Sequence, residues 1–252
     1  MTNIFIINIP SSVHRKENIS QQLDQLDQLD LNYNFFNAIN GHNDNHPLFA
    51  MYDDKLSQAY RGKSLSKGQL GCYASHYLLW KKCIELNQPI IILEDDTLIY
   101  PKPFMDIINN IDLLAKKYEC IRLFDNKRPH FFKLKQMILP HTNIYKFSKG
   151  HMSATGYLLT PRGAKKLLDH SNKWYMAVDI YMDRFWINQL ECYGTVPACL
   201  TNDPIFDSDI GYGKRSPRNL RCKIKREIFN LKELVRREYY NIKFILKMTF
   251  KR

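Results

Sequence analysis

The sequence predicts an α/β protein in which helices flank a mainly parallel, Rossmann-like sheet. Short β-branched runs alternate along the chain with amphipathic helical patterns, the order typical of strands joined by crossover helices. The run at residues 90–93 is apolar throughout, as expected of a parallel strand buried on both faces. At 252 residues and 44% hydrophobic content the chain can form a large core, and no apolar run reaches the roughly 18 residues of a transmembrane helix.

The individual elements follow from local patterns. Strands are expected at residues 3–9, 34–38, 90–93, 119–124, 143–147 and 194–200. Helices are expected at residues 13–29, 67–86, 161–168 and 178–190. Ser66 and Gln69 have the spacing of a capping box, and Thr160 with Pro161 provides an N-cap and a first-turn proline. Residues 150–156 form a small-residue loop.

Positive charge is concentrated at the C-terminal end. Residues 214–252 carry 14 Lys or Arg against three Glu, which is +11 of the chain's +12. We therefore expect a main domain at 1–213 and a basic tail at 214–252. From Ile224 onward apolar residues recur at three- and four-residue steps, which predicts a basic amphipathic helix. Two interpretations remain open: its apolar stripe packs on the domain or another subunit, or the helix lies at an anionic membrane interface.

Several classes of protein are disfavoured. The first expected strand is not followed by a glycine-rich turn, which argues against a dinucleotide-binding fold, and no HExxH metal motif occurs. The six cysteines form no CxxC pair, so we expect neither a disulfide nor a zinc site. The first residues lack the pattern of a secretory signal. These features together predict a protein of the reducing cytoplasm.

The most informative segment is PIIILEDDTLIY at residues 89–100. Its apolar run ends at Glu94, Asp95 and Asp96, which places three carboxylates at the carboxyl end of a buried strand. Crowded carboxylates repel one another unless a cation neutralises them, and oxygen ligands suit Mn²⁺ or Mg²⁺. Glu94 and Asp96 point the same way in an extended chain, so they are the candidate ligands. The motif alone is equally compatible with a solvated acidic turn.

Several segments, taken in order, resemble glycosyltransferase family 25, the bacterial lipooligosaccharide galactosyl- and glucosyltransferases. The similarity extends over residues 3–211. The segments that carry it are IINI at 6–9 with Arg15, FNAING at 36–41, SKGQLGC at 66–72 with Ser75 and His76, LEDD at 93–96, ATGYLL at 154–159, GAKKLL at 163–168, VDIYM at 178–182 and SDI at 208–210.

The resemblance implies a glycosyltransferase A fold, a UDP-sugar donor, a divalent cation (Mn²⁺ or Mg²⁺) and inversion at the anomeric carbon. It identifies Glu94-Asp95-Asp96 as the family's DXD-type motif, with Glu94 and Asp96 at the metal and Asp95 among the donor-binding residues. The further donor-binding candidates that it implies are Asn8, Ile9, Arg15, Ala38, Asn40, Gly41, Ser75 and His76.

Asp179 is the candidate general base. An inverting transfer needs a carboxylate that takes the proton of the acceptor hydroxyl, and Asp179 matches the family's aspartate at an expected helix start. Asp183, one turn later, is the alternative base, and a first-turn aspartate that only interacts with the helix dipole is the non-catalytic interpretation. The family's closing metal ligand has no evident counterpart; Asp203, Asp207 and Asp209 are the residues considered for it.

The predicted function is an inverting, metal-dependent hexosyltransferase, a β-galactosyltransferase that moves galactose from UDP-galactose to a lipooligosaccharide acceptor. UDP-glucose and UDP-N-acetylglucosamine are the alternative donors. The basic tail predicts peripheral association with the cytoplasmic face of a bacterial inner membrane. A nucleic-acid-binding protein is the non-enzyme alternative, but the domain has no recognition motif for one, so no nucleic-acid partner is expected. A glycoside hydrolase would use two carboxylates without UDP. A homo-oligomer remains open.

Overall fold

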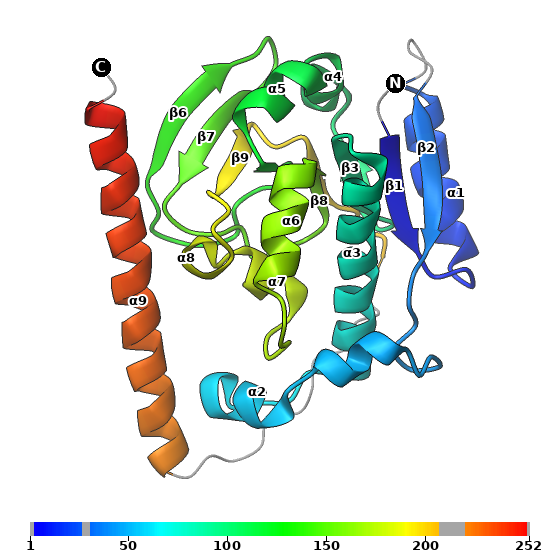
Figure 1. The fold of residues 1–252 in the computed structure, drawn as a ribbon. Helices are drawn as coiled ribbons and strands as arrows, with labels where there is room; N and C mark the ends of the chain where they lie inside the picture. Colours follow the sequence, from blue (N-terminus) through cyan, green and yellow to red (C-terminus); the bar gives the residue numbers. More distant parts are fainter. Residues whose placement is uncertain (1–2, 27–30, 207–219, 251–252) are drawn as a thin grey trace.

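The computed structural model describes residues 3–26, 31–206 and 220–250. An eight-stranded sheet lies at its centre, in the order β2-β1-β3-β8-β5-β9-β7-β6 (Figure 1). Its strands are β1 (Asn3–Asn8), β2 (Asn32–Asn37), β3 (Ile90–Glu94), β5 (Cys120–Arg122), β6 (Lys133–Ile138), β7 (Asn143–Phe147), β8 (Gly156–Leu159) and β9 (Tyr193–Val196). A separate antiparallel pair is formed by β4 (Thr97–Ile99) and β10 (Leu200–Asn202).

The main sheet is mixed, but most of its strands share one direction. β1 is parallel to β2 and β3, and β5 is parallel to β9. β8 runs antiparallel to both β3 and β5, and β7 runs antiparallel to β9 and β6. Six of the eight strands therefore point the same way, which confirms the predicted α/β class with a mainly parallel sheet. The sequence predicted a strand at β7 but not at β8, and it did not predict that these two run antiparallel to the others.

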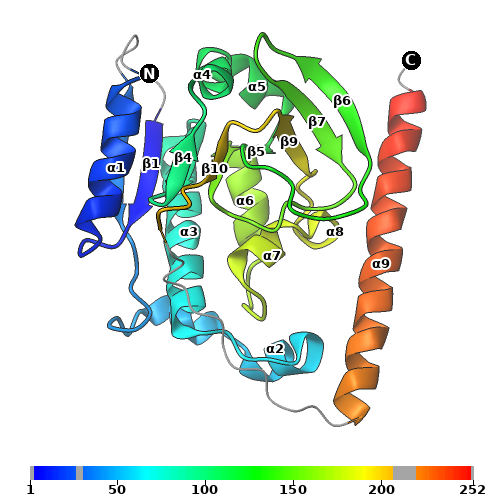
Figure 2. The ribbon, with the colours of Figure 1, turned by 180° about the vertical axis from the view of Figure 1, so that it is seen from behind.

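Helices cover both faces of the sheet (Figures 1 and 2). Those described are α1 (Val13–Asp24), α2 (Asp54–Arg61), α3 (Lys67–Leu86), α4 (Pro101–Asn109), α5 (Ile111–Lys117), α6 (Pro161–Asp169), α7 (Val178–Met182), α8 (Phe185–Asn188) and α9 (Leu220–Thr249), with a 3₁₀ turn at Pro47–Met51. Alternate residues of β3 point to opposite faces of the sheet and so belong to different layers of the core. Ile91 and Leu93 join the core under α1, α4 and α5. Ile90 and Ile92 join the core under α3, α6 and α7.

Some expected elements differ in extent. The helix expected at 178–190 is two short helices, α7 and α8, because buried Asp183 and Arg184 lie between them and bond to other segments. The strand expected at 194–200 is divided between β9 and β10, which belong to different sheets. The helix expected at 13–29 ends at Asp24, and residues 27–30 lie outside the description.

The helix α9 stands beside the domain and contacts α2 and α8 (Figure 1). Its inward face is polar and aromatic: Glu233 is buried, and the ring of Phe229 stacks on Tyr60 with 4.6 Å between centroids. Its apolar stripe points outward, with Ile228, Leu231 and Val235 exposed by 50%, 61% and 62%. The stripe therefore does not pack on the domain. The expected domain boundary at 213/214 falls among residues that are not described.

Candidate active site

The acidic motif lies where β3 ends, beside the end of β1. Asn8, the last residue of β1, donates from Nδ2 to Asp95 Oδ2 at 2.7 Å. Arg15 of α1 approaches the other Asp95 oxygen at 3.3 Å. Both oxygens of Asp95 thus bond to the protein, and Asp95 ties β1 and α1 to the motif. Glu94 and Asp96, on either side of it, remain available to face a ligand.

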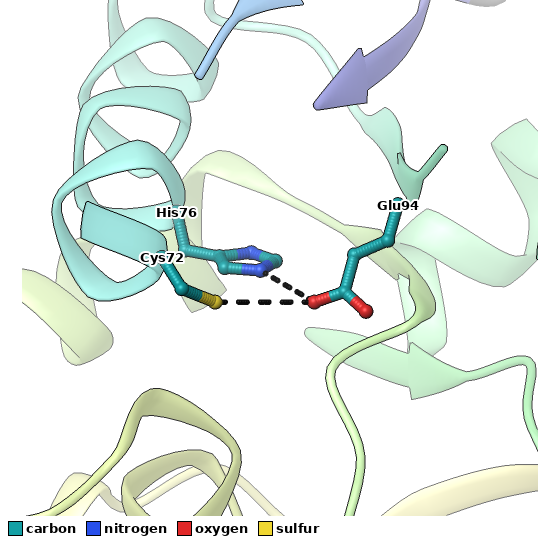
Figure 3. A group of neighbouring side chains, drawn as sticks. All are labelled: Cys72, His76 and Glu94. Carbon is teal, nitrogen blue, oxygen red and sulfur yellow. Dashed lines mark hydrogen bonds and ion pairs between the residues drawn. The ribbon is translucent and has the colours of Figure 1, made fainter. Parts of the chain in front are cut away.

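A chain of buried hydrogen bonds orients Glu94. Trp80 Nε1 donates to the Tyr157 hydroxyl at 2.9 Å, and that hydroxyl lies 2.9 Å from His76 Nδ1. Because the Tyr157 oxygen accepts from Trp80, its own proton is directed to His76 Nδ1. With Nδ1 accepting from Tyr157, the ring proton of neutral His76 is on Nε2, which donates it to Glu94 Oε1 at 3.3 Å (Figure 3). His76 is fully buried, so it positions Glu94 from behind the site.

Cys72, His76 and Glu94 bring three possible ligand atoms within 4.8 Å of one another (Figure 3). Burial, and then the charge of Glu94, raises the pKa of the Cys72 thiol well above its ordinary value. A metal ligand must be the thiolate, and both nitrogens of His76 already have partners. This group therefore fits a hydrogen-bonded support better than a soft-metal site.

Asp96 is the residue most suited to a hard cation. Its Oδ1 is buried and has no hydrogen-bond partner among the described residues. Burial, followed by the charges of Glu94 and Asp95, raises the pKa of Asp96 to about 7. An ionised oxygen left without a donor is costly, and a divalent cation would remove that cost. Asp96 and Glu94 thus fit Mn²⁺ or Mg²⁺, as the sequence predicts.

A pocket opens between this motif, the end of β1, the loop after β2 and the start of α3. It gathers most of the predicted donor-binding residues and both predicted metal ligands: Ile9, Arg15, Ala38, Asn40, Gly41, Ser75 and Asp95, with Glu94 and Asp96. Of the remaining candidates, Asn8 and His76 act behind its wall. Ile39, His42 and Gly68 also line it, although they were not among the predicted site residues. We call this cavity the nucleotide pocket, after the ligand that the family resemblance predicts for these residues.

Close backbone contact shapes the nucleotide pocket. A Cβ on Gly41 would collide with the Lys67 carbonyl, and a Cβ on Gly71 would collide with the Ile39 carbonyl. Ser75 Oγ accepts from Ile39 N and donates to the Gly71 carbonyl, both at 2.9 Å. The loop 39–41 therefore lies directly on α3. In this structure Gly41 and Ser75 hold the wall of the pocket in place.

A second cavity of about 310 Å³ lies on the other side of the acids, and we call it the acceptor pocket after the predicted role of Asp179. Cys72, Glu94 and Asp96 line both cavities and so form their common wall. Asp179 faces the acceptor pocket from the first turn of α7. Burial, and then the charge of Asp183, raises the pKa of Asp179 above its ordinary value. The motif and Asp179, 83 positions apart in the chain, thus line one cavity.

Asp183, the alternative base, lines neither of these pockets. It is buried, and it accepts from Arg128 Nη2 at 2.8 Å and Arg122 Nη2 at 3.4 Å. The backbone N–H groups of His151 and Met152 also donate to it, at 2.9 and 3.0 Å. With four donors on its two oxygens, Asp183 anchors the loop after β7 and is not placed to take an acceptor proton.

Sequence reasoning missed Lys127 and Asn202, which also line the acceptor pocket. Lys127 Nζ donates to Asn202 Oδ1 at 3.1 Å, and Asn202 Nδ2 donates to Thr155 Oγ1 at 3.3 Å. These side chains meet because β10 pairs with β4, directly after the acids. The same pairing brings Asp203 N to the Asp96 carbonyl at 2.8 Å, while the Asp203 carboxylate accepts from Asn18. Asp207 and Asp209 lie outside the described residues.

Comparison with known proteins identifies the family. The model of glycosyltransferase family 25 (LPS biosynthesis protein) matches residues 1–182. Lipooligosaccharide biosynthesis protein lic2B of Haemophilus influenzae is 25% identical over 217 residues, 82% of this chain and 78% of that protein. A glycosyltransferase 25 family member of Aedes aegypti is 27% identical over 184 residues, and procollagen galactosyltransferase 1-A of Xenopus laevis is 26% identical over 174. These two matches extend over 67% and 66% of this chain but over only 28% of each of those proteins. Because the family model covers well over half of it, this chain belongs to glycosyltransferase family 25.

Proposed function

We propose that the chain is an inverting, metal-dependent glycosyltransferase that moves a hexose from a UDP-sugar to a lipooligosaccharide acceptor. The observation that carries this proposal is the wall of Glu94 and Asp96 between the two pockets, with Asp179 beyond it. A donor in the nucleotide pocket would place its sugar–phosphate bond at that wall. Galactose is the preferred sugar because several relatives are named galactosyltransferases. A β linkage would follow from inversion of an α-linked UDP-galactose. The similarity to lic2B supports the acceptor class.

The donor side depends on the acids. A divalent cation held by Glu94 and Asp96 would stabilise the charge that the departing diphosphate acquires. The hydrogen-bonded chain through His76 and Tyr157 fixes the direction of the Glu94 carboxylate. Arg15 lines the nucleotide pocket and is held by its ion pair with Asp95. Its guanidinium is therefore already oriented to bind a phosphate of the donor. Asp95 thus orients Asn8 and Arg15, while its neighbours Glu94 and Asp96 hold the cation.

The acceptor side depends on Asp179. Its carboxylate takes the proton of the acceptor hydroxyl as that oxygen bonds to the anomeric carbon, and the bond from that carbon to the phosphate oxygen breaks on the opposite face. UDP leaves and the configuration is inverted. The raised pKa makes Asp179 a stronger base than an exposed aspartate. Lys127 and Asn202, which line the same pocket, would bind acceptor hydroxyls.

The test is UDP release from UDP-galactose, UDP-glucose and UDP-N-acetylglucosamine, with and without Mn²⁺. Wild type should use one donor in a metal-dependent way, and Asp96→Ala should lose that turnover. Asp179→Asn should lose transfer yet bind UDP like wild type, while Asp112→Asn, exposed on α5, serves as the matched control. Turnover of Asp179→Asn at the wild-type rate would remove this residue from the mechanism. Turnover of UDP-glucose alone would show that glucose, not galactose, is the transferred sugar, and the proposed reaction mechanism would stand.

We also propose that α9 attaches the enzyme to an anionic membrane surface, the cytoplasmic face of a bacterial inner membrane. The exposed stripe comprises Ile224, Ile228, Leu231, Val235, Tyr239, Ile242 and Leu246. Lysines and arginines flank it, among them Lys225, Lys232, Arg236 and Lys243. Apolar residues beside basic ones suit the interface of an anionic bilayer, where each base contributes about 1 kcal/mol. Within the part of the chain that the structure describes, no helix is long and apolar enough to cross a bilayer.

Vesicle binding tests the proposed attachment. Ile228→Ser, Leu231→Ser and Val235→Ser, combined in one variant, change exposed positions only, so the domain should fold and release UDP as before. Wild type should sediment with phosphatidylglycerol vesicles and the variant should not. Equal sedimentation of both proteins would contradict the role of the stripe. A wild-type dimer that becomes monomeric in the variant would instead assign the stripe to a second copy of the chain.

A further inference from the structure

A third cavity, of about 220 Å³, lies between α2, α8, α9 and the loop at residues 149–150. It is lined by five cationic side chains, those of Arg61, Arg128, Lys149, Arg184 and Arg237, and by two acidic ones, those of Asp183 and Glu233. The formal balance of its lining is therefore +3. We call it the cationic cavity. The lining residues from Asp183 onward, which include all those of α8 and α9, lie beyond residue 182, where the family match ends.

The two acids of the cationic cavity are already engaged. Asp183 has four donors, as described above. Glu233 accepts from Arg184 Nε at 2.6 Å and from Trp186 Nε1 at 3.0 Å, one partner on each oxygen. Neither acid is therefore available to neutralise the remaining cations. Lys149 donates to a backbone carbonyl, that of Pro129 at 3.2 Å, and the nearby acid on which its charge acts, Glu238, does not line the cavity.

Arg61 is the cation with the least compensation. It is the last residue of α2, half-buried, and it makes no hydrogen bond or ion pair with any described residue. Burial, and then the positive charge of Arg184, lowers the pKa of Arg61 to about 10. Arg226 and Arg128 act in the same direction, and Asp179 acts against them. A guanidinium offers five N–H groups, and an anion in the cavity would supply both the acceptors and the missing charge.

The cationic cavity adjoins the acceptor pocket across α7. Asp179 lines the acceptor pocket, and Asp183, one turn later on the same chain segment, lines the cationic cavity. The loop after β7 has the same arrangement: Gly150 lines the cavity, while Met152 and Ser153 line the pocket. A molecule bound at Asp179 therefore has a positively charged space beside it.

We propose that the cationic cavity binds an anionic substituent, a phosphate monoester or a carboxylate, carried by the acceptor saccharide. The inference rests on the proposed function in that the acceptor hydroxyl lies at Asp179. Arg61 and Lys149 hold the anion, with Arg128, Arg184 and Arg237 contributing charge through side chains that are already paired. A fork of guanidinium donors suits phosphate or carboxylate, whereas a neutral sugar would leave the charges of the cavity uncompensated. The cavity thus selects acidic acceptors over neutral ones.

Trp186 provides a direct reporter of binding. It lines the cationic cavity, whereas the other two tryptophans of the chain, Trp80 and Trp174, are fully buried in the core. We would titrate full-length protein, its nucleotide pocket saturated with UDP and Mn²⁺, with inorganic phosphate, glucose 6-phosphate and glucose. Both phosphates should change the tryptophan fluorescence saturably and glucose should not. Arg61→Gln should weaken binding roughly 10- to 100-fold. Arg61→Lys should recover part of the loss, and Lys82→Gln, exposed on α3, should match wild type.

The outcomes separate this inference from its rivals. Equal phosphate affinity in wild type and Arg61→Gln, or no saturable response, would overturn it. Binding of inorganic phosphate without glucose 6-phosphate would mean that the cavity accepts a free ion only. A response to phosphatidylglycerol vesicles but not to glucose 6-phosphate would assign the anion to a lipid headgroup. UDP affinity, measured for the same proteins, tests the proposed function independently, so failure of one does not conceal failure of the other.

Discussion

Replacing Asp96, the proposed metal ligand, should stabilise the metal-free protein while abolishing the proposed transferase activity. Asp96→Asn keeps the shape of the side chain but removes a charge that lies beside Glu94 and Asp95. The amide can also donate to a neighbouring carboxylate, which the ionised Asp96 cannot do. Without a bound cation, repulsion among these carboxylates is expected to lower the free energy of unfolding. The substitution should remove part of that repulsion and so raise the free energy of unfolding.

The magnitude follows from the pKa of Asp96, which the fold raises from 3.8 to about 7. Each pKa unit corresponds to about 1.4 kcal/mol, so the full shift is roughly 4 kcal/mol. Because Asp96 lines two open cavities, solvent screening reduces this figure, and we expect about 1–2 kcal/mol. The sign follows from linkage: the folded state retains a proton that the unfolded state has lost, so wild type loses stability as pH rises from about 4 to about 7.

Thermal unfolding without metal tests this expectation. At pH 8 Asp96→Asn should unfold about 3–6 °C above wild type, and at pH 4 the difference should vanish. Adding Mn²⁺ with UDP should raise the midpoint of wild type, by the equivalent of about 2.7 kcal/mol at 100 times Kd, and leave the variant almost unchanged. An Asp96→Asn protein that is less stable than wild type at pH 8 without metal would refute the reasoning, because Asp96 would then have a partner that stabilises its charge.

Three further substitutions test the supports of the site. Gly71→Ala should cost more than about 2 kcal/mol and weaken UDP binding, because its Cβ meets the backbone of the loop 39–41; chemical denaturation and UDP titration would show it. Tyr157→Phe should cost about 1–3 kcal/mol and lower kcat with little change in the UDP affinity, because His76 loses the partner that sets its proton; a wild-type kcat would contradict this role. Glu233→Ala should release α9 from the domain, because Arg184 then stays buried without its partner; faster proteolysis within α9 would reveal it, and an unchanged rate would argue against the pair as the anchor.

The sequence predicted the parts of the site that local patterns define. An apolar run ending in three acids fixes a buried strand and its carboxylates, and β3 with Glu94 follows that pattern. The capping box at Ser66 fixes the start of α3 and hence the position of His76. What local patterns cannot show is pairing between distant segments. The antiparallel return of β10 onto β4, which brings Asn202 to the acceptor pocket, leaves no periodic signal in either short strand.

The orientation of α9 is a second feature that local sequence patterns do not predict. Periodicity alone favours docking through the apolar stripe, since burial of apolar surface is the usual reason for an amphipathic helix to pack. Here the helix docks through the opposite face, where buried Glu233 meets Arg184 and Trp186 at 2.6 and 3.0 Å. A buried ion pair contributes less to stability than apolar packing would, but it admits only one orientation of the helix. The charged face therefore determines where α9 sits, and it leaves the stripe outward, on the surface where a membrane can reach it.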